Sequence, residues 1–164
     1  MWSNARMKTG SQQRYTIRAE PRGPAFEALL KYCAAMGSYC SLVDNFPRSK
    51  KGREASEHFF ESAKPSLIGV DDVHEWPGTG PSKGTVPLWK FRLEPGLLDL
   101  MLAHSRGLYG FQTPKLPEDL AVYRADGSVL LGSVAHEHIG WMNLTAEERD
   151  DARLGLVDLR VMGR

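Results

Sequence analysis

The stretch Leu116–Leu144, LPEDLAVYRADGSVLLGSVAHEHIGWMNL, decides the fold class of this chain. Short apolar runs lie on both sides of Asp126-Gly127, a pattern typical of two strands joined by a turn. Because Asp-Gly readily adopts positive φ angles, the sequence predicts a β-hairpin with a tight primed turn. The predicted register has two facing pairs, Tyr123 with Leu130 and Val122 with Leu131.

The residues after this hairpin predict one more strand and one more helix. A second chain reversal is expected near Glu137–Gly140, and Trp141–Leu144 then returns as a strand. Thr145 and Glu148 have the spacing of a capping box, in which each side chain bonds the backbone of the other residue. A short helix is therefore expected to begin there.

Upstream of the hairpin, two further strands are predicted, Leu67–Trp76 and Thr85–Leu93. The turn-rich segment Pro77–Gly84 separates them, so they are expected to pair as a long hairpin. In the second strand, Trp89 and Phe91 alternate with charged residues, which predicts that the aromatic face is buried. A short strand is also expected over residues 15–19.

Helical spacing of apolar residues is clearest after Gly23-Pro24, because proline suits the first position of a helix. Apolar residues recur there every three or four positions as far as Val43, so one long helix ending at Asn45 is predicted. Shorter helices are predicted over Glu54–Lys64 and Pro95–His104.

These elements define the α+β class, because antiparallel strands and helices occur without regular βαβ alternation. We expect an antiparallel sheet of two hairpins packed against the long N-terminal helix and the shorter helices. The length of 164 residues suits one domain. Residues 1–13 are polar and are expected to form a mobile segment ahead of a single domain over 14–164.

Charge and hydropathy narrow the classes of partner. The chain has 21 Lys and Arg against 20 Asp and Glu, a net charge of +1, whereas nucleic-acid-binding proteins usually carry a clear basic excess. A nucleic-acid partner is therefore disfavoured, and the basic run Arg48–Arg53 is predicted to be a solvated loop. No apolar stretch approaches the roughly 20 residues that cross a bilayer. No signal-peptide pattern is present either, so we expect no membrane partner and a cytoplasmic location.

The two cysteines, Cys33 and Cys40, are expected to be reduced and buried. Seven residues along the predicted helix place them about 10 Å apart, too far for a disulfide. The spacing of cysteines and histidines matches no common zinc motif, so neither a metal nor a cofactor is predicted.

The densest group of potentially catalytic side chains is His136-Glu137-His138. In a continuous strand both imidazoles would lie on one side, where they could hold a metal or transfer a proton. The group is not the helical HExxH motif, because Gly140 stands at the second histidine position. The structural alternative is that His136 bonds a loop carbonyl while Glu137 and His138 lie in an exposed turn.

Aromatic residues in predicted loops and strand ends are the candidates for a protein interface, where aromatic side chains are enriched. Each is also a candidate core residue. The interface candidates are Trp76, Tyr109, Phe111 and Trp141.

Several short motifs resemble a pattern found in small uncharacterised bacterial proteins. These motifs are Trp76-Pro77-Gly78-Thr79, Leu116-Pro117-Glu118-Asp119-Leu120, Arg124-Ala125-Asp126-Gly127 and Ala135-His136-Glu137. Some proteins with this WPGT…LPEDL…RADG…AHE pattern resemble the immunity partners of polymorphic toxins. The resemblance covers about residues 70–145 and implies a protein partner, but it implies no catalytic residue.

The leading hypothesis is therefore a non-enzymatic cytosolic protein-binding domain of immunity type. The alternative is a small metal-dependent or acid–base enzyme that uses His136, Glu137 and His138, with His74 or Asp72 as a further partner.

Overall fold

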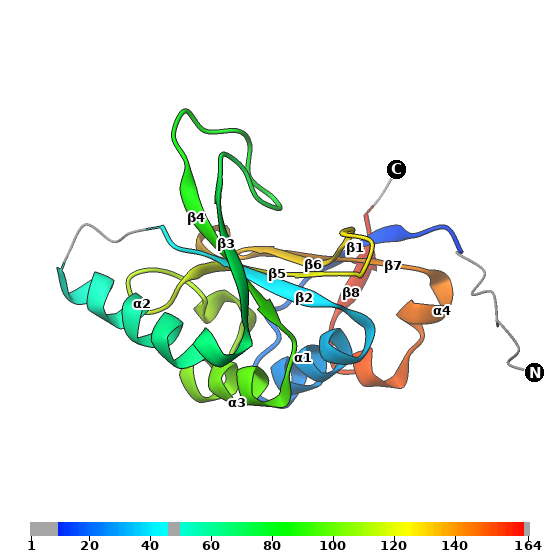
Figure 1. Ribbon diagram of the computed structural model, residues 1–164. Helices are drawn as coiled ribbons and strands as arrows, with labels where there is room; N and C mark the ends of the chain where they lie inside the picture. Colours follow the sequence, from blue (N-terminus) through cyan, green and yellow to red (C-terminus); the bar gives the residue numbers. More distant parts are fainter. Residues whose placement is uncertain (1–9, 46–49, 163–164) are drawn as a thin grey trace, which may run out of the picture.

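The computed structural model describes residues 10–45 and 50–162 of the chain (Figure 1). Residues 1–9, which make up most of the predicted mobile segment, lie outside the described residues, as does Arg48 of the basic run. Gln13, predicted to end that segment, is already the first residue of a strand.

The described residues form an eight-stranded sheet in which all neighbouring strands are antiparallel. The order across the sheet is β3-β4-β2-β5-β6-β7-β1-β8, so the α+β class is confirmed but the sheet is larger than two hairpins. The strands are β1 (Gln13–Ile17), β2 (Tyr39–Val43), β3 (Leu67–Val73), β4 (Val86–Arg92), β5 (Glu118–Tyr123), β6 (Val129–Val134), β7 (Ile139–Leu144) and β8 (Leu159–Val161).

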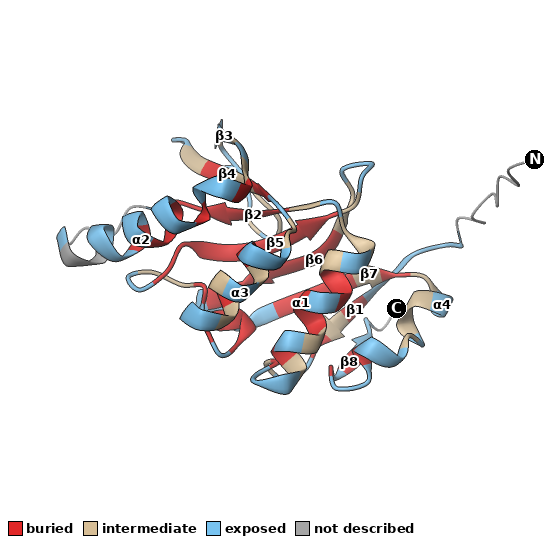
Figure 2. Ribbon diagram, turned by 60° about the horizontal axis from the view of Figure 1, so that its bottom comes forward, coloured by how far each residue is buried: buried red, intermediate tan, exposed pale blue. Residues whose placement is uncertain are grey.

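Helices α1 (Pro24–Met36), α2 (Lys50–Ala63) and α3 (Pro95–His104) lie on one face of the sheet, and the outer part of the β3–β4 hairpin stands on the other (Figure 1). Buried residues line the strands and the inward sides of these helices (Figure 2). The α-helices of the described chain are α1 (Pro24–Met36), α2 (Lys50–Ala63), α3 (Pro95–His104) and α4 (Ala146–Arg149).

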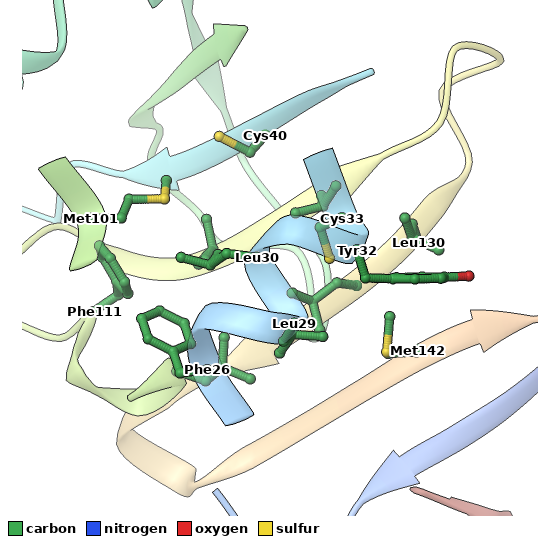
Figure 3. Packing of buried hydrophobic residues seen from close by; sticks show 14 of the residues in the cluster. Phe26, Leu29, Leu30, Tyr32, Cys33, Cys40, Met101, Phe111, Leu130 and Met142 are labelled. Carbon is green, nitrogen blue, oxygen red and sulfur yellow. The ribbon is translucent and has the colours of Figure 1, made fainter. Parts of the chain in front are cut away.

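The main core lies between α1 and the sheet, where Phe26, Leu29 and Leu30 of the helix pack over the strands (Figure 3). Under α2, the ring of Phe60 stacks on that of Trp89, with centroids 4.2 Å apart. The predicted burial of the aromatic face of β4 holds in part, because Phe91 is fully buried and Trp89 partly buried, whereas Leu88 on the other face is buried as well. This burial of apolar surface is the main force that holds the helical layer on the sheet.

The prediction of one long helix as far as Val43 is wrong, because α1 ends at Met36 and β2 follows. At Gly37 the chain passes so close to the sheet that a Cβ would lie 2.7 Å from Cγ1 of Val122. The last four residues of β2 are buried on both of its faces, so the strand lacks polar alternation. Their apolar spacing therefore also fitted a helix.

The Asp126-Gly127 hairpin is confirmed, but its turn is not the predicted primed type. Gly127 alone in the turn has a positive φ, 85°, and the N–H of Arg124 donates to the carbonyl of Ser128 at 2.8 Å. A three-residue loop with a left-handed glycine introduces a bulge. Val122 therefore faces Leu131 as predicted, whereas Tyr123 faces Val129 and not Leu130.

Other local predictions hold to different degrees. Helix α3 has the predicted bounds, and Thr145 and Glu148 form the predicted capping box. The predicted strand Leu67–Trp76 ends earlier, at Val73. The prediction of a loop for the basic run is wrong in its described part, because Lys50–Arg53 forms the first turn of α2 despite Gly52.

Candidate functional site

The group His136-Glu137-His138 lies in the turn between β6 and β7, where a 3₁₀ turn over Ala135–Glu137 interrupts the strand. His138 has a left-handed backbone, with φ 54°. The ring of His136 lies 3.6 Å from the Glu137 carboxylate, from Nε2 to Oε1. Within the described residues, the His136 ring makes no hydrogen bond to a backbone carbonyl. The prediction that His136 bonds a loop carbonyl is therefore wrong. Glu137 and His138 are exposed in a turn, as the structural alternative predicts.

His74 does not join this group, because its ring Nδ1 bonds the carbonyl of Gly84 in its own hairpin at 3.1 Å. Among the residues that the structure describes, no three His, Cys, Asp or Glu side chains are arranged to hold a metal ion. For the metal-dependent form of the enzyme hypothesis, the described residues therefore provide no assembled set of metal ligands.

The four aromatic interface candidates lie at different depths. Phe111 is fully buried and packs against Phe26, with ring centroids 6.3 Å apart, so it offers no surface to a partner. Tyr109 and Trp141 are 6% and 7% exposed, so each reaches the surface only at an edge. Trp76 is half-buried in the β3–β4 loop.

Trp76 ties this loop to the sheet through Asp119, whose carboxylate accepts a 2.8 Å hydrogen bond from the indole Nε1. The other oxygen of Asp119 accepts from the backbone N–H of Ala135, also at 2.8 Å. Burial raises the pKa of Asp119 above its ordinary value, and these two hydrogen bonds oppose the rise. Trp76 and Asp119 thus form a structural contact between elements that are far apart in the chain.

The described surface has a hollow of about 290 Å³ with a strong excess of basic side chains. We call it the basic hollow. It lies where the β1–α1 connection, the end of α3, the following loop and the β6–β7 turn meet. The charged or titratable residues that line it are Glu20, Arg22, His104, Arg106, Tyr109, Lys115 and His138.

Glu20 contributes the carboxylate of the basic hollow, and local contacts already engage it. One oxygen accepts from the backbone N–H of Tyr109 at 3.0 Å, and the other lies 3.2 Å from Nη1 of Arg22. Within residues 10–45 and 50–162, neither Arg106 nor Lys115 forms an ion pair. The positive charge of these two residues is therefore uncompensated by a protein carboxylate.

Backbone contacts shape the basic hollow. The hydroxyl of Ser105 donates to the carbonyl of Gly107 at 2.6 Å and closes the turn after α3. A Cβ at Gly107 would lie 2.4 Å from Oε1 of Glu20, so glycine is needed for this close approach. Nδ1 of His104 bonds the carbonyl of Leu100 at 2.9 Å, which fixes the ring orientation.

Tyr109 forms the buried side of the basic hollow. Its ring lies 5.3 Å from that of His138, centroid to centroid. Burial raises the pKa of Tyr109, and the negative charge of Glu20 adds to the rise. The phenol is therefore neutral at physiological pH, and the hollow can offer an anion both hydrogen-bond donors and positive charge.

Sequence reasoning singled out Tyr109 and His138 for separate reasons and missed the other members of the basic hollow. Glu20 and Arg22 come from the N-terminal part of the chain, whereas Arg106 and Lys115 follow α3. No spacing rule connects these positions, because the fold alone brings them together.

Comparison of this chain with known protein families, curated proteins and solved structures found no match. In the part of the chain that the structure describes, every helix is too short or too polar to span a bilayer.

Proposed function

We propose that this chain is a non-enzymatic protein-binding domain whose basic hollow receives acidic side chains of the partner. The observation that carries the proposal is the local charge. Three Arg and Lys side chains and two histidines line the hollow with a single carboxylate, and that carboxylate is already bound by Arg22 and the backbone of Tyr109. Complementary charge at an interface speeds association and selects the partner.

The shape of the basic hollow favours a protein partner over a nucleic acid. Its basic groups converge on one concave site of about 290 Å³, whereas a nucleic-acid backbone needs positive charge along an extended track. Arginine and tyrosine are also enriched in protein interfaces, and both types line this site. An acidic loop or chain end of a partner protein has the matching size and charge.

The immunity-type role is the narrower form of this proposal, and it rests on the resemblance of the WPGT, LPEDL, RADG and AHE motifs. In that form, the partner is a toxin domain that presents an acidic segment to the basic hollow. Toxicity of a candidate toxin in the presence and absence of this chain would test the narrower form.

The experiment that tests the basic hollow uses a fluorescent deca-glutamate peptide and measures anisotropy at several salt concentrations. We expect saturable binding that weakens with salt, because exposed charges are screened. The variant Arg106→Ser/Lys115→Ser should bind about tenfold more weakly, a loss of about 1.4 kcal/mol. The matched control is Lys83→Ser, which removes an exposed lysine from the β3–β4 loop, and its binding should be unchanged.

Equal binding by the double variant and the control would overturn the assignment of the basic hollow. Absence of saturable peptide binding by the wild-type chain would do the same. Circular dichroism of each variant confirms that the fold is retained.

A further inference from the structure

The face of the sheet that the helices do not cover carries a second hollow, of about 260 Å³, with a different chemical character. We call it the apolar hollow. It lies over β6, β7 and β1, and the β3–β4 loop borders it through Gly78. The residues that line it are Arg14, Thr16, Gly78, Val134, Ile139, Gly140, Trp141 and Met162.

Four of its eight lining residues have apolar side chains, and two of these, Ile139 and Met162, are exposed to water. Ile139 and Met162 are 45% and 54% exposed, which makes them two of the most exposed large apolar residues in the described chain. Trp141, which is 7% exposed, contributes only the edge of its ring to this wall. Apolar surface gathered in a concave site is typical of ligand pockets.

A single cation lies at the polar end of the apolar hollow. The guanidinium carbon of Arg14 lies 5.1 Å from the ring centroid of Trp141, and its Nε donates to Oδ1 of Asn143 at 3.4 Å. Both contacts are with neutral groups, and no carboxylate is among the residues that line the hollow. Thr16 adds a hydroxyl beside this charge. Among residues 10–45 and 50–162, the apolar hollow therefore has a largely apolar wall and one positive charge that no carboxylate of its lining pairs with.

Close packing and a hydrogen bond within the protein shape the border of the apolar hollow. Gly78 has a φ of 86°, and a Cβ there would lie 2.5 Å from Cγ2 of Val134 and 2.7 Å from Cη2 of Trp141. The Trp76–Asp119 hydrogen bond holds the same loop on the sheet. A site that is already shaped loses less entropy on binding.

We propose that the apolar hollow binds a small amphipathic carboxylate, a ligand with one acid group and a short apolar body. The carboxylate lies against Arg14 and Thr16, and the apolar body covers Ile139, Met162 and the exposed edge of Trp141. This site is separate from the basic hollow and goes beyond the protein-binding function proposed above.

The test is a calorimetric titration with octanoate, with octanol as the probe that has the same chain and no charge. We expect saturable binding of octanoate and at least tenfold weaker binding of octanol, because octanol cannot pair with Arg14. Arg14→Gln should weaken octanoate binding about tenfold and leave octanol binding unchanged. Ile139→Ser should weaken the binding of both probes.

The matched control is Arg160→Gln, which removes an exposed arginine on β8 that faces Thr16 but does not line the hollow. Its octanoate affinity should equal that of the wild type. Equal losses in Arg14→Gln and Arg160→Gln, or no saturable octanoate binding, would overturn the proposal. Deca-glutamate binding by the same Arg14→Gln sample should be unchanged, so failure of one site is distinguishable from failure of the other.

Discussion

The indole of Trp76 donates a 2.8 Å hydrogen bond to the buried carboxylate of Asp119, and this contact joins the β3–β4 loop to the start of β5. Asp119 has a φ of 57°, an uncommon backbone conformation for a residue with a side chain. Since Asp119 also accepts from the N–H of Ala135, one carboxylate connects three separate segments of the chain.

The first prediction concerns the energy of this contact. Asparagine at position 119 also tolerates a positive φ. In Asp119→Asn, however, an NH2 group replaces one of the two carboxylate oxygens, so either Trp76 or Ala135 loses its hydrogen-bond acceptor. Trp76→Phe removes the donor and keeps an aromatic ring. In a double-mutant cycle measured by urea unfolding, we expect a coupling energy of about 1–2 kcal/mol. Strictly additive losses would show that the contact contributes nothing to stability.

A second prediction follows from the pKa of Asp119, which burial raises above its ordinary value. The folded protein therefore favours the protonated carboxyl group of Asp119. The contribution of this group to the free energy of unfolding is lost as the pH rises through its raised pKa. The free energy of unfolding of the wild type minus that of Asp119→Asn should thus be largest below the ordinary carboxyl pKa of about 4 and fall as the pH rises through the raised pKa of Asp119. A difference that instead grows with pH would contradict this sign.

The third prediction concerns the two thiols. Cys33 and Cys40 are free and buried, as the sequence predicts, although they lie on a helix and a strand. Burial raises the pKa of Cys33 to about 12 and also raises that of Cys40. Since the thiolate is the reactive form, labelling of the native protein by a disulfide reagent at pH 8 should be slow and limited by unfolding.

In urea, the same reagent should label both cysteines at once, which is the control for this measurement. A rapid native-state reaction of either thiol would mean that its side chain is accessible in the folded protein.

The fourth prediction compares two glycines in the sheet. At Gly132 a Cβ would lie 2.2 Å from Cζ2 of Trp141, which faces it on β7, so Gly132→Ala should destabilise the fold by about 2 kcal/mol. Gly69 on the edge strand β3 has no heavy atom within 4 Å of a Cβ, so Gly69→Ala should be neutral or stabilising. Thermal unfolding of the two variants gives the comparison, and equal losses would refute the close packing.

Local signals in the sequence predict the elements that local contacts define. Pro95 and the apolar spacing after it give α3 with its observed bounds, and the capping box gives α4. In β2, by contrast, burial on both faces removes the two-residue alternation that identifies a strand. The hairpin register also differs by one residue at Tyr123, because the turn type depends on the backbone conformation of Asp126 and Gly127 together.

The candidate sites were less accessible to sequence reasoning than the fold. The composition of residues His136–His138 is enough to single out this exposed turn. The two histidines do not share one site, because His138 lines the basic hollow and His136 does not. Arg106 and Lys115 have no sequence signal, because isolated basic residues are ordinary on a protein surface. Their meaning depends on the Glu20 side chain that the fold places beside them.

The position of β1 in the sheet has a consequence for how the protein is made. Gln13 faces Leu144 on β7, and Ile17 faces Leu159 on β8, so both partners of this strand are synthesised long after the strand itself. Until then, the strand leaves the ribosome with no partner for its backbone hydrogen bonds. Contacts between such distant segments form slowly and expose the nascent chain to aggregation. Completion of the sheet therefore waits for β7 and β8, and chaperones that hold the nascent chain should matter most before residue 159 emerges.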